Sequence, residues 1–257
     1  MSRLLMGFLA AAVMIPLCAA EETESVDLRY RSYRTWSLQL PSETWFPLQD
    51  GIRIPHAGGD TFAFEYEGTS LKVDTDGDGE LDRTIKALVD PKTMVSSTRV
   101  ILNGTDKSGQ PFRYAARLRN DADGWEWAPG GAMVGTVNSQ AGPIAVRIID
   151  QNGNGKFNDV GSDAMIVGNT DHAMMLSATI YVDDKLQNIA IAPDGKSFQL
   201  SAYDGPTSEI DMSTSFNSKA VLLSSVIISA DRKHSFDIAA IEGAVRVPAG
   251  TYTVVAG

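Results

Sequence analysis

The 257-residue chain contains a single cysteine, Cys18, and this residue lies within the first twenty positions. The rest of the sequence therefore offers no disulfide, no thiol nucleophile and no cysteine-based metal site. Whatever fold it adopts has to be stable without covalent cross-links.

Basic residues and long apolar runs are also scarce. Lys and Arg total 22 against 32 Asp and Glu, which gives a formal net charge of −10. An excess of negative charge repels phosphate backbones and anionic lipids, so we expect no nucleic-acid partner. After the first segment no run reaches the roughly 18 apolar residues of a membrane-spanning helix, so we expect no transmembrane span. The acidity suits divalent cations, although it can also serve solubility alone.

Residues 1–20 have the composition of a secretory signal peptide. Arg3 supplies a positive start, an apolar stretch follows over 4–17, and two small residues precede a pair of glutamates. This order is typical of a cleaved export signal. We predict cleavage after Ala20 and a mature protein in the periplasm, at the cell surface or outside the cell. The leucine directly before Cys18 disfavours a lipoprotein, because lipid-modifying processing prefers a small residue there.

The remaining chain alternates short apolar and polar runs with Gly, Asp, Asn and Pro, and it shows little helical periodicity. A period of two residues is typical of half-buried strands, and strands at roughly 8–12-residue spacing favour a sandwich or barrel. We predict an all-β fold of antiparallel sandwich or barrel-like sheets, with few or no helices. The predicted strands include 28–31, 36–40, 62–66, 70–73, 99–102, 112–115, 144–149, 164–167, 188–191, 197–200, 221–229, 235–238, 244–247 and 251–255.

The mature chain is long enough for one large or two modest β domains. We predict two: residues 21–140, which contain a loop at 74–82, and residues 141–257, which contain a loop at 150–163. The sequence stops directly after an apparent strand, so we expect it to be a piece of a longer protein.

The two loops share the pattern D-x-[DN]-G-[DN]-G, which starts at Asp74 and again at Asp150. Calcium is a hard cation that binds six to eight oxygens, and side chains at positions 1, 3 and 5 of a tight loop point inward. Glycine at position 6 adopts the left-handed turn, and the carbonyl at position 7 adds a ligand. Position 8 is apolar in both loops (Leu81 and Phe157) and anchors the loop to the core. Position 9, Asp82 or Asn158, offers one more oxygen.

These residues resemble known calcium loops. The first loop resembles those of integrin-type propellers and thrombospondin type 3 repeats, and the second is similar to the dockerin loop. The whole chain resembles uncharacterised exported bacterial β-proteins that carry EF-hand-like loops. The resemblance implies calcium as the cofactor. It implies ligands from Asp74, Asp76, Asp78, the Glu80 carbonyl and Asp82 in the first loop, and from Asp150, Asn152, Asn154 and the Lys156 carbonyl in the second.

The loops depart from the EF-hand at position 12, where a bidentate acid is replaced by Ile85 and Gly161. Asp159 or Asp163 could serve instead in the second loop. Helices are not expected on either side, so the chain is predicted to be neither a calcium sensor nor a dockerin domain. Fewer charges indicate weak binding, on the order of 10⁻⁴–10⁻³ M. The same residue types also make metal-free hairpin turns, but the crowded carboxylates of the first loop repel one another unless a cation intervenes.

No catalytic motif is found, so we expect a non-catalytic calcium-binding protein with a structural or interaction role and a protein or glycan partner. The alternative is a carbohydrate-binding or hydrolase accessory module that uses Trp125 and Trp127, two indoles on one face of a strand. Packing in the core explains the same pair. A hydrolase built on paired carboxylates is a third hypothesis. Exposure of the two indoles distinguishes the first two.

Overall fold

The computed structural model describes residues 23–49, 51–55, 58, 61–121, 123–211, 222–239, 241 and 243–256. The predicted signal peptide and Cys18 lie outside these residues. Every element described is a β-strand and every sheet is antiparallel, which confirms the predicted fold class. The described part contains no helix of the length and hydropathy that crossing a membrane requires.

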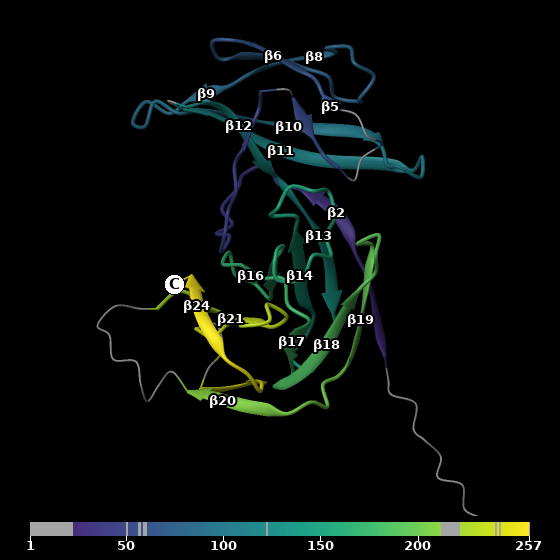
Figure 1. Cartoon of the computed structure of the whole chain (residues 1–257), viewed down its shortest axis with the longest axis vertical. Helices are drawn as coiled ribbons and strands as arrows, with labels where there is room; N and C mark the ends of the chain where they lie inside the picture. The colour runs from purple at the N-terminus through teal and green to yellow at the C-terminus, as the bar shows by residue number, and fades with distance from the viewer. Residues whose placement is uncertain are drawn as a thin grey trace, which may run out of the picture.

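One end of the elongated molecule is built from two layers of strands (Figure 1). The inner layer is a five-stranded sheet and the outer layer is a three-stranded sheet, with a two-stranded pair beside them. The inner sheet has the order β3 (Phe46–Pro47), β12 (Gly124–Pro129), β11 (Pro111–Asp121), β10 (Ser96–Thr105) and β9 (Leu88–Val89). The outer sheet is β6 (Phe64–Glu67), β7 (Ser70–Val73) and β8 (Arg83–Lys86), and the pair is β4 (Ile52–Arg53) and β5 (Thr61–Phe62).

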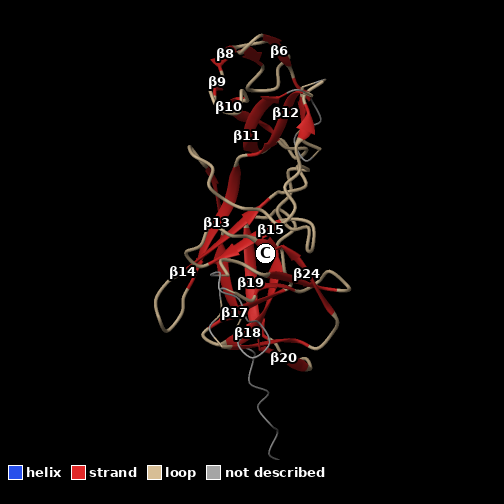
Figure 2. Ribbon diagram, turned by 90° about the vertical axis from the view of Figure 1, so that its left-hand side faces the viewer, coloured by secondary structure: helices blue, strands red, loops and turns tan. Residues whose placement is uncertain are grey.

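The other end contains four sheets that pack around a common interior, again without helices (Figure 2). Five strands form the first sheet: β16 (Met174–Met175), β15 (Ala164–Val167), β14 (Ile144–Ile149), β13 (Gly131–Val137) and β2 (Arg29–Ser32). Four form the second: β1 (Glu24–Asp27), β19 (Ser197–Ala202), β18 (Lys185–Ile191) and β17 (Thr179–Val182). The last two are β22 (Ser235–Asp237), β21 (Val226–Ser229) and β24 (Tyr252–Ala256), and then β20 (Thr207–Asp211) with β23 (Ala244–Pro248).

The two ends are closely joined. Only Gly130 separates β12 from β13, so the chain passes from one end into the other almost without a break. One cluster of buried apolar side chains extends from Leu71 and Leu118 to Ile148 and Phe198. The predicted domain boundary at 140 lies between the paired strands β13 and β14. Division into two domains stays a prediction, and the strands on both sides of its boundary belong to one sheet.

Trp125 and Trp127 are buried in this core. Their side chains are 5% and 4% exposed. The Trp127 ring lies 4.9 Å from the ring of Phe46 and 6.3 Å from that of Tyr114, measured between centroids. With so little of either indole exposed, the pair does not form the exposed ledge that the alternative hypothesis requires.

The strand predicted at 36–40 is wrong. Within it only Gln39 makes a backbone bridge, to His172, and no ladder forms. Besides the two backbone hydrogen bonds of Gln39, side-chain contacts hold this part of the chain: the Arg117 guanidinium lies 3.9 Å from the Trp36 ring centroid and 2.6 Å from the carboxylate of Glu43, just beyond the segment. Cation–π stacking and an ion pair replace the expected sheet pairing.

We expect Trp127→Ala to lower the free energy of unfolding by about 3–5 kcal/mol, because it leaves a large cavity in the core. Leu88, which is 77% exposed, provides the control, and Leu88→Ala should change stability by about 0.5 kcal/mol or less. Denaturant unfolding measures both. Equal stabilities for the two variants would contradict the core assignment of Trp127.

Candidate metal-binding site

The first candidate loop links β7 to β8, and the carboxylate of Asp74 organises its backbone. Asp74 is fully buried. One of its oxygens accepts hydrogen bonds from the N–H groups of Gly77 (2.7 Å) and Asp76 (3.2 Å), and the other accepts one from Gly79 (3.0 Å). Gly77 and Gly79 have φ angles of +82° and +89°, which favour glycine. The chain therefore wraps around one carboxylate, as expected of position 1.

Three carboxylates of this loop converge. Asp74, Asp76 and Asp78 each offer one oxygen, and these oxygens lie within 4.8 Å of one another. The pKa of Asp76 is raised, first by partial loss of hydration and then by the negative charge of Asp78 and its other acidic neighbours. Oxygen ligands at this spacing are the kind that a hard divalent cation binds. The triad could hold a metal ion.

The other predicted positions of the first loop have different partners. Asp82 accepts two hydrogen bonds from Thr75, one from its N–H (3.0 Å) and one from its hydroxyl (2.7 Å), and so ties the ends of the loop together. Glu80 is exposed, and its N–H donates to a carboxylate oxygen of Asp78 (2.8 Å). Ile85, at position 12, continues β8 opposite Leu71.

The second loop links β14 to β15 and repeats this arrangement around Asp150. Asp150 is fully buried. Its Oδ1 accepts from the N–H of Asn154 (3.0 Å), and its Oδ2 accepts from the N–H of Gly155 (2.6 Å) and the hydroxyl of Tyr114 (2.7 Å). Burial raises its pKa to about 6, although these hydrogen bonds favour the charged form. The Tyr114 contact, between residues 36 positions apart, gives no signal in the sequence.

Asp159 lies opposite the two amide side chains of the second loop. The amide nitrogens of Asn152 (3.1 Å) and Asn154 donate to the same carboxylate oxygen of Asp159. Turning each amide by 180° exchanges its nitrogen for its oxygen. The amide oxygens of Asn152 and Asn154 now accept hydrogen bonds from the N–H groups of Asn154 (3.2 Å) and Lys156 (2.8 Å), which this turn would break. In exchange, the two amide oxygens and the Asp159 carboxylate would together hold a cation.

Asp163 has the most unusual environment among the predicted ligands. It is fully buried, and one oxygen accepts a hydrogen bond from the N–H of Asp159 (3.0 Å). The other oxygen, Oδ1, has no hydrogen-bond partner among the described residues. Burial, followed by the charge of Asp150, raises the pKa of Asp163 to about 9. A buried carboxylate oxygen without a partner is costly, and a cation is a partner that removes the cost.

The last two predicted positions of the second loop lie toward its outer side. Asn158 is half-buried, and its amide donates to the carbonyl of Pro193 (3.4 Å). Lys156 is exposed, and its N–H donates to the amide oxygen of Asn154 (2.8 Å). The triad in the first loop is the only group of at least three acidic, histidine or cysteine side chains gathered within 4.8 Å among the described residues.

No family model, curated protein or solved structure matches this chain.

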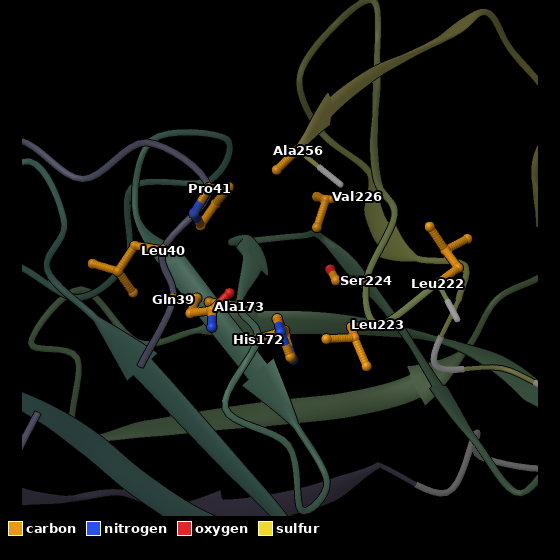
Figure 3. Close-up of a pocket in the computed structure, with 10 residues that line it drawn as sticks. All are labelled: Gln39, Leu40, Pro41, His172, Ala173, Leu222, Leu223, Ser224, Val226 and Ala256. Atoms are coloured by element: carbon orange, nitrogen blue, oxygen red, sulfur yellow. The ribbon is translucent and has the colours of Figure 1, made fainter. Parts of the chain in front are cut away.

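A separate hollow of about 430 Å³ lies beside the last strand, β24 (Figure 3). His172 and Ser224 both line it. The Ser224 hydroxyl donates to Asp237 (2.8 Å), whereas the closest side-chain partner of the His172 ring is the Thr170 hydroxyl, at 3.4 Å. Serine and histidine are thus not paired as nucleophile and base in this hollow.

We expect Asp163→Asn to have opposite effects with and without calcium. The amide oxygen can keep the hydrogen bond from Asp159, and no charge is buried, so in chelator the thermal midpoint should stay the same or rise. The rise in midpoint on adding calcium should shrink, because an anionic ligand is lost.

Asp184→Asn makes the same chemical change at an exposed position and should leave both midpoints unchanged. A full calcium response in Asp163→Asn would exclude Asp163 as a ligand. Severe destabilisation in chelator would show that its charge is satisfied in some other way.

The raised pKa values predict how stability depends on pH in chelator. Asp150 and Asp163 bind a proton more tightly in the folded chain, with pKa values of about 6 and about 9 against an ordinary 3.8. Their contribution to stability is complete below pH 3.8 and is lost as pH rises through the folded values. Denaturant unfolding in chelator should therefore give a free energy that falls from pH 5 to pH 9. A free energy that rises over this interval would contradict the burial of these two carboxyls.

Proposed function

We propose that this protein is an exported, calcium-binding β-sandwich protein whose two loops are stabilised by the cation, and that its role is structural or in binding a partner. The convergence of Asp74, Asp76 and Asp78, with one oxygen each within 4.8 Å, is the observation that carries this proposal. Carboxylates held this close repel one another, and a divalent cation turns the repulsion into attraction.

The chemistry of the loops favours calcium over other metals. All candidate ligands are carboxylate, amide or carbonyl oxygens, and neither loop contains a histidine or cysteine. Zinc and copper prefer nitrogen and sulfur ligands. Magnesium requires a near-ideal octahedron and retains several waters, whereas calcium accepts the irregular oxygen sets of flexible loops.

The buried carboxylates of the second loop support a second site. One carboxylate oxygen of Asp163 has no hydrogen-bond partner among the described residues. Asp150 is fully buried, and its negative charge helps to raise the pKa of Asp163. With a pKa of about 9, Asp163 is protonated at neutral pH in the absence of a cation, and a bound cation would displace this proton and compensate both carboxylates. A cation is therefore expected to stabilise this loop more than the presence of two amide side chains among its ligands suggests.

Weak binding is sufficient for such a role. With an affinity on the order of 10⁻⁴–10⁻³ M, the sites would be filled under extracellular conditions and largely free at cytosolic calcium levels. The signal-peptide composition of residues 1–20 is consistent with that destination. A cation at about ten times its Kd stabilises the folded state by about 1.4 kcal/mol per site.

We expect millimolar calcium to raise the thermal midpoint by about 3–6 °C per occupied site relative to chelator. Asp74→Ala combined with Asp78→Ala should remove a large part of this rise, because it takes two oxygens from the triad. Differential scanning calorimetry on the mature chain measures the effect.

Glu65→Ala combined with Glu67→Ala is the matched control. It removes the same charge from exposed positions on β6, in the sheet that contains the first loop. This variant should keep the full calcium response. Identical melting curves in calcium and in chelator for the unsubstituted protein would refute the proposal.

A further inference from the structure

A groove of about 510 Å³ lies directly against the second loop. This volume is within the range of about 300–1,000 Å³ that is usual for small-ligand sites. Three parts of the chain meet there: the segment from β3 to β5, the end of Trp127 in β12, and the tip of the second loop. The lining residues are Phe46, Pro47, Gln49, Gly51, Arg53, Pro55, Thr61, Trp127, Asn152, Gly153 and Asn154.

The side chains in the groove combine aromatic rings with neutral hydrogen-bonding groups. Phe46 is half-buried and rests on Trp127. Uncharged polar groups come from Gln49, Thr61 and the two loop asparagines, and Arg53 is the only charged side chain among the lining residues. Arg53 is exposed and forms no ion pair with any residue that the structure describes.

This composition selects a class of ligand. Aromatic rings pack against the C–H faces of a sugar ring, while amide and guanidinium groups hydrogen-bond to its hydroxyls. A purely apolar ligand would leave these polar groups without partners, which is costly. A polyanion would meet a single arginine on a protein of net charge −10.

The groove also touches the candidate cation site itself. Asn152 and Asn154 are predicted cation ligands, and both line the groove in a half-buried position. The loop lacks a bidentate acid at position 12, where Gly161 stands. Its remaining candidate ligands, which are Asp150, Asn152, Asn154, the Lys156 carbonyl, Asp159 and Asp163, supply six oxygens at one each, whereas calcium accepts up to eight. Oxygens of a ligand in the groove can fill the remaining positions.

The packing of Gly153 couples the loop to the groove. A Cβ at Gly153 would lie 2.6 Å from Cε2 of Phe46 and 3.2 Å from Cη2 of Trp127, so the loop backbone rests directly on both rings. Any change in the loop conformation on cation binding is thereby transmitted to the aromatic surface of the groove.

We propose that this groove binds a neutral saccharide, two neighbouring hydroxyls of which complete the coordination of a cation held by the second loop. This inference rests on the proposed calcium binding. It differs from the platform hypothesis in its residues, because Phe46, Arg53 and the loop asparagines form the site, Trp127 lines it with only 4% of its surface exposed, and Trp125 takes no part.

The test is a glycan array of neutral mannose, galactose, glucose and N-acetylhexosamine oligosaccharides, probed with the mature protein in millimolar calcium and in chelator. Isothermal titration calorimetry then measures the affinity for the oligosaccharide that binds most strongly. We expect the glycan to bind in calcium and its affinity to fall at least about tenfold in chelator. With europium bound in place of calcium, luminescence lifetimes should report fewer coordinated waters when the glycan is added.

The variant Gln49→Ala with Arg53→Ala removes two hydrogen-bonding side chains of the groove but no predicted cation ligand. Glycan affinity should fall by about tenfold, whereas the calcium-induced rise in thermal midpoint should remain. Arg29→Ala removes an exposed arginine from β2, outside the groove, and should leave glycan binding unchanged.

The possible failures are distinguishable. A normal calcium response with no neutral glycan bound overturns the groove proposal and leaves the calcium proposal standing. Binding of acidic glycans alone overturns the ligand class. Equal binding in calcium and in chelator overturns the role of the cation, and loss of the thermal response refutes calcium binding itself.

Discussion

The structure depends most on how it accommodates two buried carboxylates, those of Asp150 and Asp163, between its two ends. Asp150 is compensated by backbone N–H groups and by the hydroxyl of Tyr114, which reaches it from β11 in the other group of sheets. Tyr114 stacks on Tyr30 of β2, and Tyr30 in turn packs against Phe157 of the loop. The compensation of the Asp150 charge in the loop therefore depends on the packing of the two ends against each other.

The two loops have similar sequences but different structural settings. The first links two strands of the outer sheet, where Asp76 and Asp78 are exposed, so a cation there stiffens a hairpin and relieves repulsion that water already screens. The second is enclosed, and its carboxylates have lost much of their hydration. Although the second loop has the weaker sequence match, a cation there, as proposed, would compensate the larger electrostatic cost. Counting acidic residues alone ranks the two sites in the opposite order.

Local patterns in the sequence predicted those features of the structure that depend on interactions between residues close together in the chain. Alternating apolar residues and Gly-Asp turns placed 74–82 and 150–163 between strands, as the structure has them, because strand period and turn chemistry act over a few residues. Contacts between distant segments were not predictable. Whether Trp125 and Trp127 face solvent depends on β3 and the outer sheet covering them, and the bond from Tyr114 to Asp150 depends on the meeting of two sheets. The segment 36–40 alternates like a strand, yet stacking of Trp36 on Arg117 determines its course.

Glycine at position 4 of both loops has a structural explanation that calcium coordination alone does not provide. Gly77 and Gly153 both have positive φ, and each lies against a phenylalanine: a Cβ would meet Phe62 at 3.4 Å in the first loop and Phe46 at 2.6 Å in the second. Each loop thus rests on an aromatic ring through its backbone. Phe62 is a core residue, only 3% exposed, so the first loop packs against the interior of the protein. Phe46 lines an open groove, so a cation bound in the second loop, as proposed, would act on a surface that a ligand can reach. If both proposals hold, the second loop, rather than the first, is the one placed to couple cation binding to recognition.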